Sequence, residues 1–113
     1  MGPGVAVPRI LARAGLGLDD FEIIEMHEAF GGQVAANLAA WEHGWKEEPI
    51  GKVDRDKLNQ LGGSIAIGHP FAATGARIVT QLANEMARSD YRYGLVSICG
   101  AGATAAAMIL ERR

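Results

Sequence analysis

The three side chains best suited to acid–base or nucleophilic chemistry are His27, His69 and Cys99. Each stands where an expected strand or helix begins or ends. His27 follows the apolar run 21–26, Cys99 ends the run 94–99, and His69 precedes an expected helix. Ligands of open α/β sheets bind at the carboxyl ends of the strands. His27 and Cys99 fall at such strand ends, and a loop next to a helix start could bring His69 to the same crevice.

His69 lies between Gly68 and Pro70. A proline disfavours the α region for the residue before it, which keeps His69 extended. The positive end of the following helix dipole disfavours a charged imidazolium. A neutral ring that acts as a general base or as a hydrogen-bond acceptor is one interpretation. A histidine that only caps the helix is the other, and the local sequence leaves both open.

Cys99 and His27 also have two interpretations each. A cysteine at the end of an apolar strand is usually an inert, small apolar residue. However, Cys99 precedes the turn Gly100-Ala101-Gly102, whose free backbone N–H groups could hold a developing oxyanion. His27 could serve a site at the strand end, or it could be a capping or otherwise satisfied polar residue where strand gives way to helix.

Composition excludes several classes of function. The chain has 113 residues, 49 % of them hydrophobic, which suffices for one domain with a core. Its net charge of −2, without runs of like charge, predicts no nucleic-acid surface, and no apolar run is long enough for a membrane span. The single cysteine excludes an internal disulfide, favours a reducing compartment and matches no zinc spacing, so no metal is expected. The glycine cluster matches neither a phosphate-binding P-loop nor a dinucleotide fingerprint.

The periodicity of apolar residues predicts an α/β fold. Strands separated by helices imply a sheet with crossover connections, closed here by a C-terminal hairpin and left with an edge that another segment covers. Residues 44–68 show no sustained period and are expected to form a long loop. The expected helices span 8–14, 30–43 and about 70–88, and the expected strands span 21–26, 94–99 and 103–110.

Three sequence blocks together resemble the C-terminal part of thiolases: MHEAF at 26–30, GGSIAIGHPFAATGARIV at 62–79 and ICGAGATAAAMILE at 98–111. The opening GPGVAVPRILARAGLGLDDFEIIE resembles the helix and strand that precede the first block in that family. The HEAF and GHPFAATGAR wording is most similar to the 3-ketoacyl-CoA thiolases of fatty-acid β-oxidation. The resemblance implies the C-terminal part of a layered αβα fold, with a mixed sheet.

The resemblance also implies an activity and site roles. Thiolases cleave a 3-ketoacyl-CoA with free CoA, or run the reverse Claisen condensation. His69 would activate a nucleophilic cysteine of the N-terminal half and help to stabilise the thioester oxygen. Cys99 would be the acid/base for the enolate or for CoA. His27, where many thiolases carry asparagine, would help to form an oxyanion hole, often through a bound water.

Further residues follow from the same resemblance. The N–H of Ala101 would contribute to a second oxyanion hole, at a position where the family usually has glycine. Gly68, Phe71 and Gly100 are the expected substrate contacts. Acyl-CoA and CoA are expected as substrates, no further cofactor is implied, and a homo-oligomer is expected for the full enzyme.

The cysteine count departs from the family pattern. The thiolase mechanism needs two cysteines, and Cys99 corresponds to the acid/base and not to the nucleophile. Residues 1–113 are therefore expected to be a thiolase C-terminal domain, a fragment without its N-terminal half and inactive alone. A stand-alone, non-catalytic domain that binds CoA or a partner is the alternative; a ketoacyl synthase fits less well. The expected location is the cytoplasm, or the mitochondrial matrix in a eukaryote.

Overall fold

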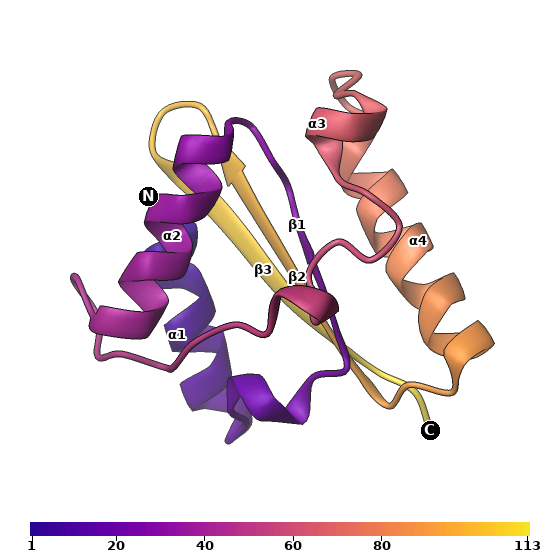
Figure 1. Ribbon diagram of the computed structural model, residues 1–113, viewed down its shortest axis with the longest axis horizontal. Helices are drawn as coiled ribbons and strands as arrows, with labels where there is room; N and C mark the ends of the chain where they lie inside the picture. Colours follow the sequence, from indigo (N-terminus) through magenta and orange to yellow (C-terminus); the bar gives the residue numbers. More distant parts are fainter.

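The computed structural model describes residues 1–113, and it shows a three-stranded sheet with helices on both faces (Figure 1). Strand β1 (Ile23–Met26) runs parallel to β2 (Tyr93–Gly100). Strand β3 (Thr104–Glu111) pairs with β2 in the antiparallel sense and closes the C-terminal hairpin. The sheet order β1-β2-β3 confirms the predicted mixed α/β sheet.

Helices α1 (Pro3–Ala14) and α2 (Gly31–His43) cover one face of the sheet, and α4 (Thr74–Ser89) covers the other (Figure 1). Each interface has its own apolar cluster, so every residue of β1 is buried. The first cluster centres on Trp41, whose indole N–H donates to the carbonyl of Pro3 at 2.9 Å. The second consists of Ile23, Ile78, Leu82, Met86 and Val96. No helix combines the length and the apolar character that a membrane crossing requires.

The first helix begins at Pro3, five residues before the predicted start at Pro8. Pro8 lies inside the helix, where its ring nitrogen cannot donate the usual backbone hydrogen bond. Burial of Val7, Pro8 and Leu11 offsets that loss. Pro3 satisfies the same preference for proline in a first helical turn. The helix ends at Gly15 in the left-handed conformation, as predicted.

The predicted loop 44–68 contains short elements that the periodicity missed: a 3₁₀ turn at Arg55–Lys57 and the four-residue helix α3 (Ser64–Ile67). Asn59 fixes this segment to β1, because its side chain exchanges hydrogen bonds of 2.8 and 2.9 Å with the backbone of Met26. Its backbone N–H also donates to the carbonyl of Ile24 at 2.8 Å. The segment that leads to His69 is thus tied to the strand that ends at His27.

The remaining boundaries differ from the prediction by a few residues. The apolar run 21–26 becomes strand only from Ile23, and the helix expected from about residue 70 begins at Thr74. Strand β2 is one residue longer at each end than predicted, and β3 is shifted by one residue toward the C-terminus. The hairpin turn therefore covers 101–103. Gly94 lets α4 approach β2 closely, since a Cβ there would lie 2.6 Å from the sulfur of Met86.

Candidate active site

The carboxyl ends of β1 and β2 lie at the same end of the sheet, beside α3 at the top of Figure 1. His27 follows β1 directly, and its backbone N–H donates to the carbonyl of Ser97 on β2 at 2.8 Å. Only 3 % of His27 is exposed. The strand pairing therefore holds this imidazole against the end of the sheet.

The structure brings His69 next to His27. Their ring centroids lie 4.3 Å apart and the ring planes are tilted by 43°. His69 follows Gly68, whose φ of +114° is a conformation that suits glycine. Phe71 lies 5.1 Å from the ring of His69 and is 86 % exposed. Of the expected catalytic residues, the two histidines thus form the centre of the site.

His69 does not cap a helix. The first turn of α3 is served by Glu28, whose carboxylate accepts from the N–H of Ile65 at 3.4 Å, and no N–H of α3 or α4 donates to His69. Instead, Nδ1 of His69 lies 2.5 Å from the hydroxyl oxygen of Thr74, the first residue of α4. This geometry favours the base over the cap, because it leaves Nε2 of His69 without a partner in the chain and available for a proton.

His27 is held from behind by Ser64, the first residue of α3. The distance from Nδ1 of His27 to the hydroxyl oxygen of Ser64 is 2.7 Å. Burial lowers the pKa of His27, and the neighbouring His69 and Arg77 lower it further, against a smaller opposing effect of Glu28. His27 is therefore a neutral ring at physiological pH, which can donate a hydrogen bond from one nitrogen only.

Cys99 lies at the same end of the sheet, but on β2. It is half-buried near the end of β2 and pairs with Ala105 of β3. Side chains alternate along a strand, so Cys99 lies on the face of Leu95, which packs with α1 and α2, whereas His27 lies on the α4 side. The thiol forms no hydrogen bond with either histidine. The structure thus brings Cys99 to the sheet end but not into the histidine pair.

The turn after Cys99 exposes backbone groups. Ala101 is exposed, and no group of the chain accepts a hydrogen bond from its N–H. Gly102 and Ala103 continue the turn with φ of +80° and +60°. A Cβ at Gly100 would lie 2.5 Å from the hydroxyl oxygen of Thr104, so a side chain there would displace that hydroxyl group. The free N–H of Ala101 can therefore serve as an oxyanion donor.

Sequence reasoning missed the residues that support the histidines: Ser64, Thr74, Arg77, Gln81 and Glu25. Their signal in the sequence was weak, since hydroxyl and guanidinium groups occur widely on helices. Ser64, Thr74 and Arg77 all lie within the glycine-rich block that holds His69. Their polar groups face the two imidazoles because α3 and α4 flank the same end of β1.

Glu25 is a buried acid on β1, two residues before His27, and only 1 % of it is exposed. Gln81 donates to its Oε1 at 3.4 Å, and Oε2 has no partner. Burial raises the pKa of Glu25 to about 7, although Arg77 acts in the opposite direction. The carboxyl group is thus largely protonated below neutral pH.

The burial of Glu25 predicts that the protein becomes less stable as pH rises. The ordinary pKa of 4.5 applies in the unfolded chain and about 7 in the folded one, so the folded state binds more protons between these values. The free energy of unfolding should fall by about 3 kcal/mol as pH rises through this window. In Glu25→Gln, the free energy measured by urea unfolding should not fall with pH in this window. The exposed control Glu48→Gln should retain the fall, and the same fall in Glu25→Gln would refute the raised pKa of Glu25.

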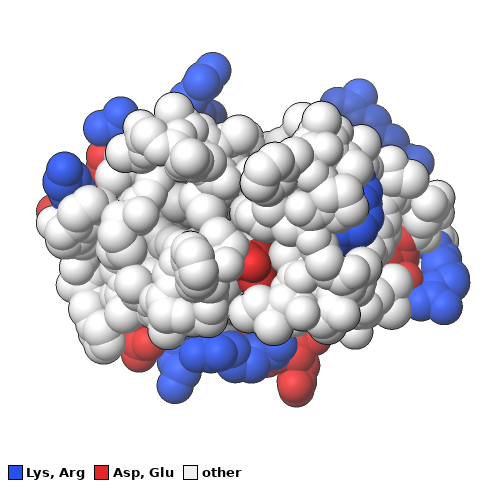
Figure 2. Space-filling model, turned by 90° about the horizontal axis from the view of Figure 1, so that it is seen from above, with Lys and Arg blue, Asp and Glu red and all other residues white.

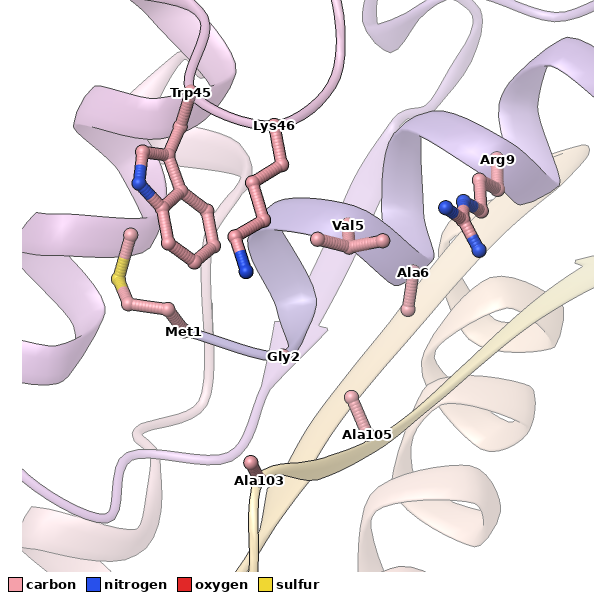
Figure 3. Close-up of a pocket in the computed structure, with 9 residues that line it drawn as sticks. All are labelled: Met1, Gly2, Val5, Ala6, Arg9, Trp45, Lys46, Ala103 and Ala105. Atoms are coloured by element: carbon pink, nitrogen blue, oxygen red, sulfur yellow. The ribbon is translucent and has the colours of Figure 1, made fainter.

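The largest cavity lies away from the histidines. It has a volume of about 500 Å³ and lies between the start of α1, the hairpin turn and the loop after α2 (Figure 3). Its lining contains no imidazole, thiol or carboxylate, so the histidine pair is the better candidate for chemistry. The lining residues are Met1, Gly2, Val5, Ala6, Arg9, Trp45, Lys46, Ala103 and Ala105. No cluster of His, Cys, Asp and Glu is placed to hold a metal ion.

Comparison with known proteins identifies the family. Residues 1–112 match the family described as "Thiolase, C-terminal domain". The chain belongs to the thiolase family. The predicted resemblance is confirmed over nearly the whole chain.

Individual thiolases agree with this result. The chain is 50 % identical to a 3-ketoacyl-CoA thiolase of Shewanella amazonensis and 51 % identical to one of Yersinia pestis, each over 118 residues. A solved structure of an acetyl-CoA acetyltransferase from Syntrophomonas wolfei superimposes with a TM-score of 0.88 at 35 % identity. Each comparison covers 98 % of this chain and 27 % of the other protein. This thiolase domain thus has the predicted layered fold and spans about a quarter of the length of its relatives.

Proposed function

We propose that this chain supplies the acid–base part of a 3-ketoacyl-CoA thiolase, working with a thiolase N-terminal half that carries the nucleophilic cysteine. The observation that carries the proposal is the contact between the His27 and His69 rings at the carboxyl end of the sheet, where Cys99 also lies. The reaction is acyl transfer between 3-ketoacyl-CoA and CoA, with CoA as a substrate and no further cofactor.

The first half of the reaction needs a base and an acid. Nε2 of His69 takes the proton from the partner's cysteine, and the thiolate attacks the 3-keto carbon. The bond between carbons 2 and 3 then breaks. The acyl group stays on the partner's cysteine, and the enolate of acetyl-CoA takes its proton from the thiol of Cys99. The thiolate of Cys99 remains.

The second half reverses these proton movements. The Cys99 thiolate takes the proton of CoA, whose sulfur attacks the acyl thioester. The partner's cysteine leaves as a thiolate and recovers its proton from His69. His27 and the N–H of Ala101 donate hydrogen bonds to the oxygens that become negative in these steps. Atoms and protons balance over the cycle.

The surface around the histidines supports a partner at this end of the molecule. The end is largely white and hollowed between two lobes, with an acidic group in the hollow and most Lys and Arg at the periphery (Figure 2). Several large apolar side chains near the imidazoles are exposed: Phe30, Ile65, Ile67 and Phe71. Exposed apolar groups in such number are typical of a surface that another segment covers. We assign this surface to the N-terminal half and to the acyl chain, and Gly68, Phe71 and Gly100 to substrate contacts.

Co-expression tests the proposal. The 113-residue chain would be produced with an N-terminal half that comprises all of the Shewanella amazonensis relative outside the 118 matched residues. Thiolysis of acetoacetyl-CoA and of longer 3-ketoacyl-CoA would be measured. We expect turnover from the pair and none from this chain alone, because its only cysteine is the acid/base. The matched control is the same half with its nucleophilic cysteine replaced by alanine, which should be inactive.

The single cysteine also favours a second candidate, a non-catalytic domain that binds CoA or a protein partner. Calorimetry with CoA separates the two. Binding of CoA by this chain, together with no turnover from the co-expressed pair, would support the second candidate and refute the first. The bacterial relatives make the cytoplasm the proposed location, and a homo-oligomer is proposed for the assembled enzyme.

A further inference from the structure

The two adjacent imidazoles are each held through Nδ1 by a different hydroxyl group. Nδ1 of His27 lies 2.7 Å from the hydroxyl oxygen of Ser64, and Nδ1 of His69 lies 2.5 Å from that of Thr74. A hydroxyl group can donate or accept, so the distances alone do not place the protons. The other partners of the two hydroxyl groups differ, and they decide the direction of each hydrogen bond.

Ser64 donates to His27. Nη2 of Arg77 lies 3.3 Å from the hydroxyl oxygen of Ser64, and a guanidinium group can only donate. The hydroxyl proton of Ser64 needs an acceptor because the residue is buried, and Nδ1 of His27 is the acceptor within reach. Nδ1 of His27 therefore carries no proton, and the proton of the neutral ring lies on Nε2.

Thr74 accepts from His69. Its hydroxyl group lies 3.4 Å from the carbonyl oxygen of Pro70, and a carbonyl can only accept. The hydroxyl proton of Thr74 is thus directed to Pro70, and its oxygen accepts from Nδ1–H of His69. Nε2 of His69 keeps its lone pair. Free neutral histidine favours the proton on Nε2. The Nδ1–H tautomer of His69 is therefore one that the protein must impose.

We infer that Ser64 with Arg77, and Thr74, are positioning residues that hold His27 and His69 in opposite tautomers. His27 presents an Nε2–H donor and His69 presents an Nε2 acceptor. Only the catalytic use of the two rings rests on the proposed function. In that function, Nε2–H of His27 faces the developing oxyanion, and Nε2 of His69 takes the thiol proton. The assignment of the protons stands on the hydrogen bonds alone.

A chain of polar groups keeps Arg77 in place. Its Nη1 donates to Oε1 of Gln81 at 3.1 Å, and the amide nitrogen of Gln81 donates to Glu25 at 3.4 Å. The charged and titratable groups that act on His27 are His69, Arg77 and Glu28. Arg77 is the group that takes one lone pair of Ser64 and so directs its proton toward His27.

Nitrogen-15 NMR of the imidazole rings tests the inference on this chain. The ¹⁵N-labelled protein would be studied at a pH at which both rings are neutral, and the one-bond and two-bond couplings would locate each ring proton. We expect Nε2–H for His27 and Nδ1–H for His69. A proton on Nδ1 of His27, or on Nε2 of His69, would overturn the inference.

Two crossed variants show which hydroxyl group holds which ring. Thr74→Ala should move the proton of His69 to Nε2 and leave His27 unchanged. Ser64→Ala should shift the Nδ1 resonance of His27, which loses its hydrogen bond, and leave His69 unchanged. Thr74→Ser and Ser64→Thr retain the hydroxyl groups and should retain the wild-type tautomers. Ring protons that stay in place in Thr74→Ala would contradict the role of Thr74.

The co-expressed enzyme gives a second readout. Thr74→Ala should lower kcat by about tenfold with little change in KM, which corresponds to the loss of one hydrogen bond, and Thr74→Ser should restore it. A wild-type kcat in Thr74→Ala, despite a changed tautomer, would show that the tautomer does not serve catalysis. If His27 and His69 have opposite tautomers but the co-expressed polypeptides catalyse no thiolysis, the proposed function is refuted and the proton assignment stands.

Discussion

Replacing His69 with alanine in the co-expressed enzyme is expected to lower kcat/KM for thiolysis by about 10²- to 10⁴-fold, the range typical of a general base. The nucleophilic thiol would then have to lose its proton to water. The assay is the steady-state cleavage of acetoacetyl-CoA at saturating CoA. The effect should fall mainly on kcat, because His69 acts on a reacting proton and not on the remote part of CoA.

His43 provides the matched control for this variant. It lies at the end of α2, its side chain is 72 % exposed, and its one charged neighbour is Glu42 at 3.9 Å. His43→Ala should therefore leave turnover and the free energy of unfolding nearly unchanged. A near-normal rate in His69→Ala, with the same fold by circular dichroism, would remove His69 from the mechanism.

Replacing Cys99 with alanine is expected to slow the proton transfer at the α-carbon strongly. In the co-expressed enzyme, the exchange of the α-protons of acetyl-CoA with deuterated water should fall by about 10²-fold or more. Thiolysis should fall in parallel, since CoA also loses its base. Mass spectrometry of the recovered acetyl-CoA measures the exchange directly.

The fold should tolerate this change. Cys99 is only half-buried near the end of β2, so its truncation to alanine leaves no large cavity. An unchanged unfolding midpoint would show that lost exchange reflects chemistry. Exchange at the wild-type rate in folded Cys99→Ala would contradict the acid/base role, whatever the rate of thiolysis.

The pairing of His27 with His69 shows what the sequence could predict. The apolar run before His27 indicated a strand, and parallel strands end at one edge of a sheet, so a shared site was predictable. The contact between the rings depended on the segment that leads to His69. Asn59 ties that segment to β1, and α3 is a single short turn without a detectable period.

The supporting residues were beyond the sequence for a different reason. The hydroxyl groups of Ser64 and Thr74 act through hydrogen bonds to His27 and His69, which lie 37 and 5 residues away in the chain. Glu25 sits in a strand that is buried on both faces, so strand alternation could not mark it as buried. Pro8 favoured a helix start, and the burial of the surrounding turn overrode that preference.

In the proposed mechanism, this chain supplies the acid and the base, and the nucleophile lies on another segment. The most direct measurement is the intact mass of both polypeptides after the co-expressed enzyme has been incubated with acyl-CoA and quenched with acid. The added acyl mass should lie on the N-terminal half, and none should lie on the 113-residue chain. An acyl group on Cys99 would refute the proposed mechanism.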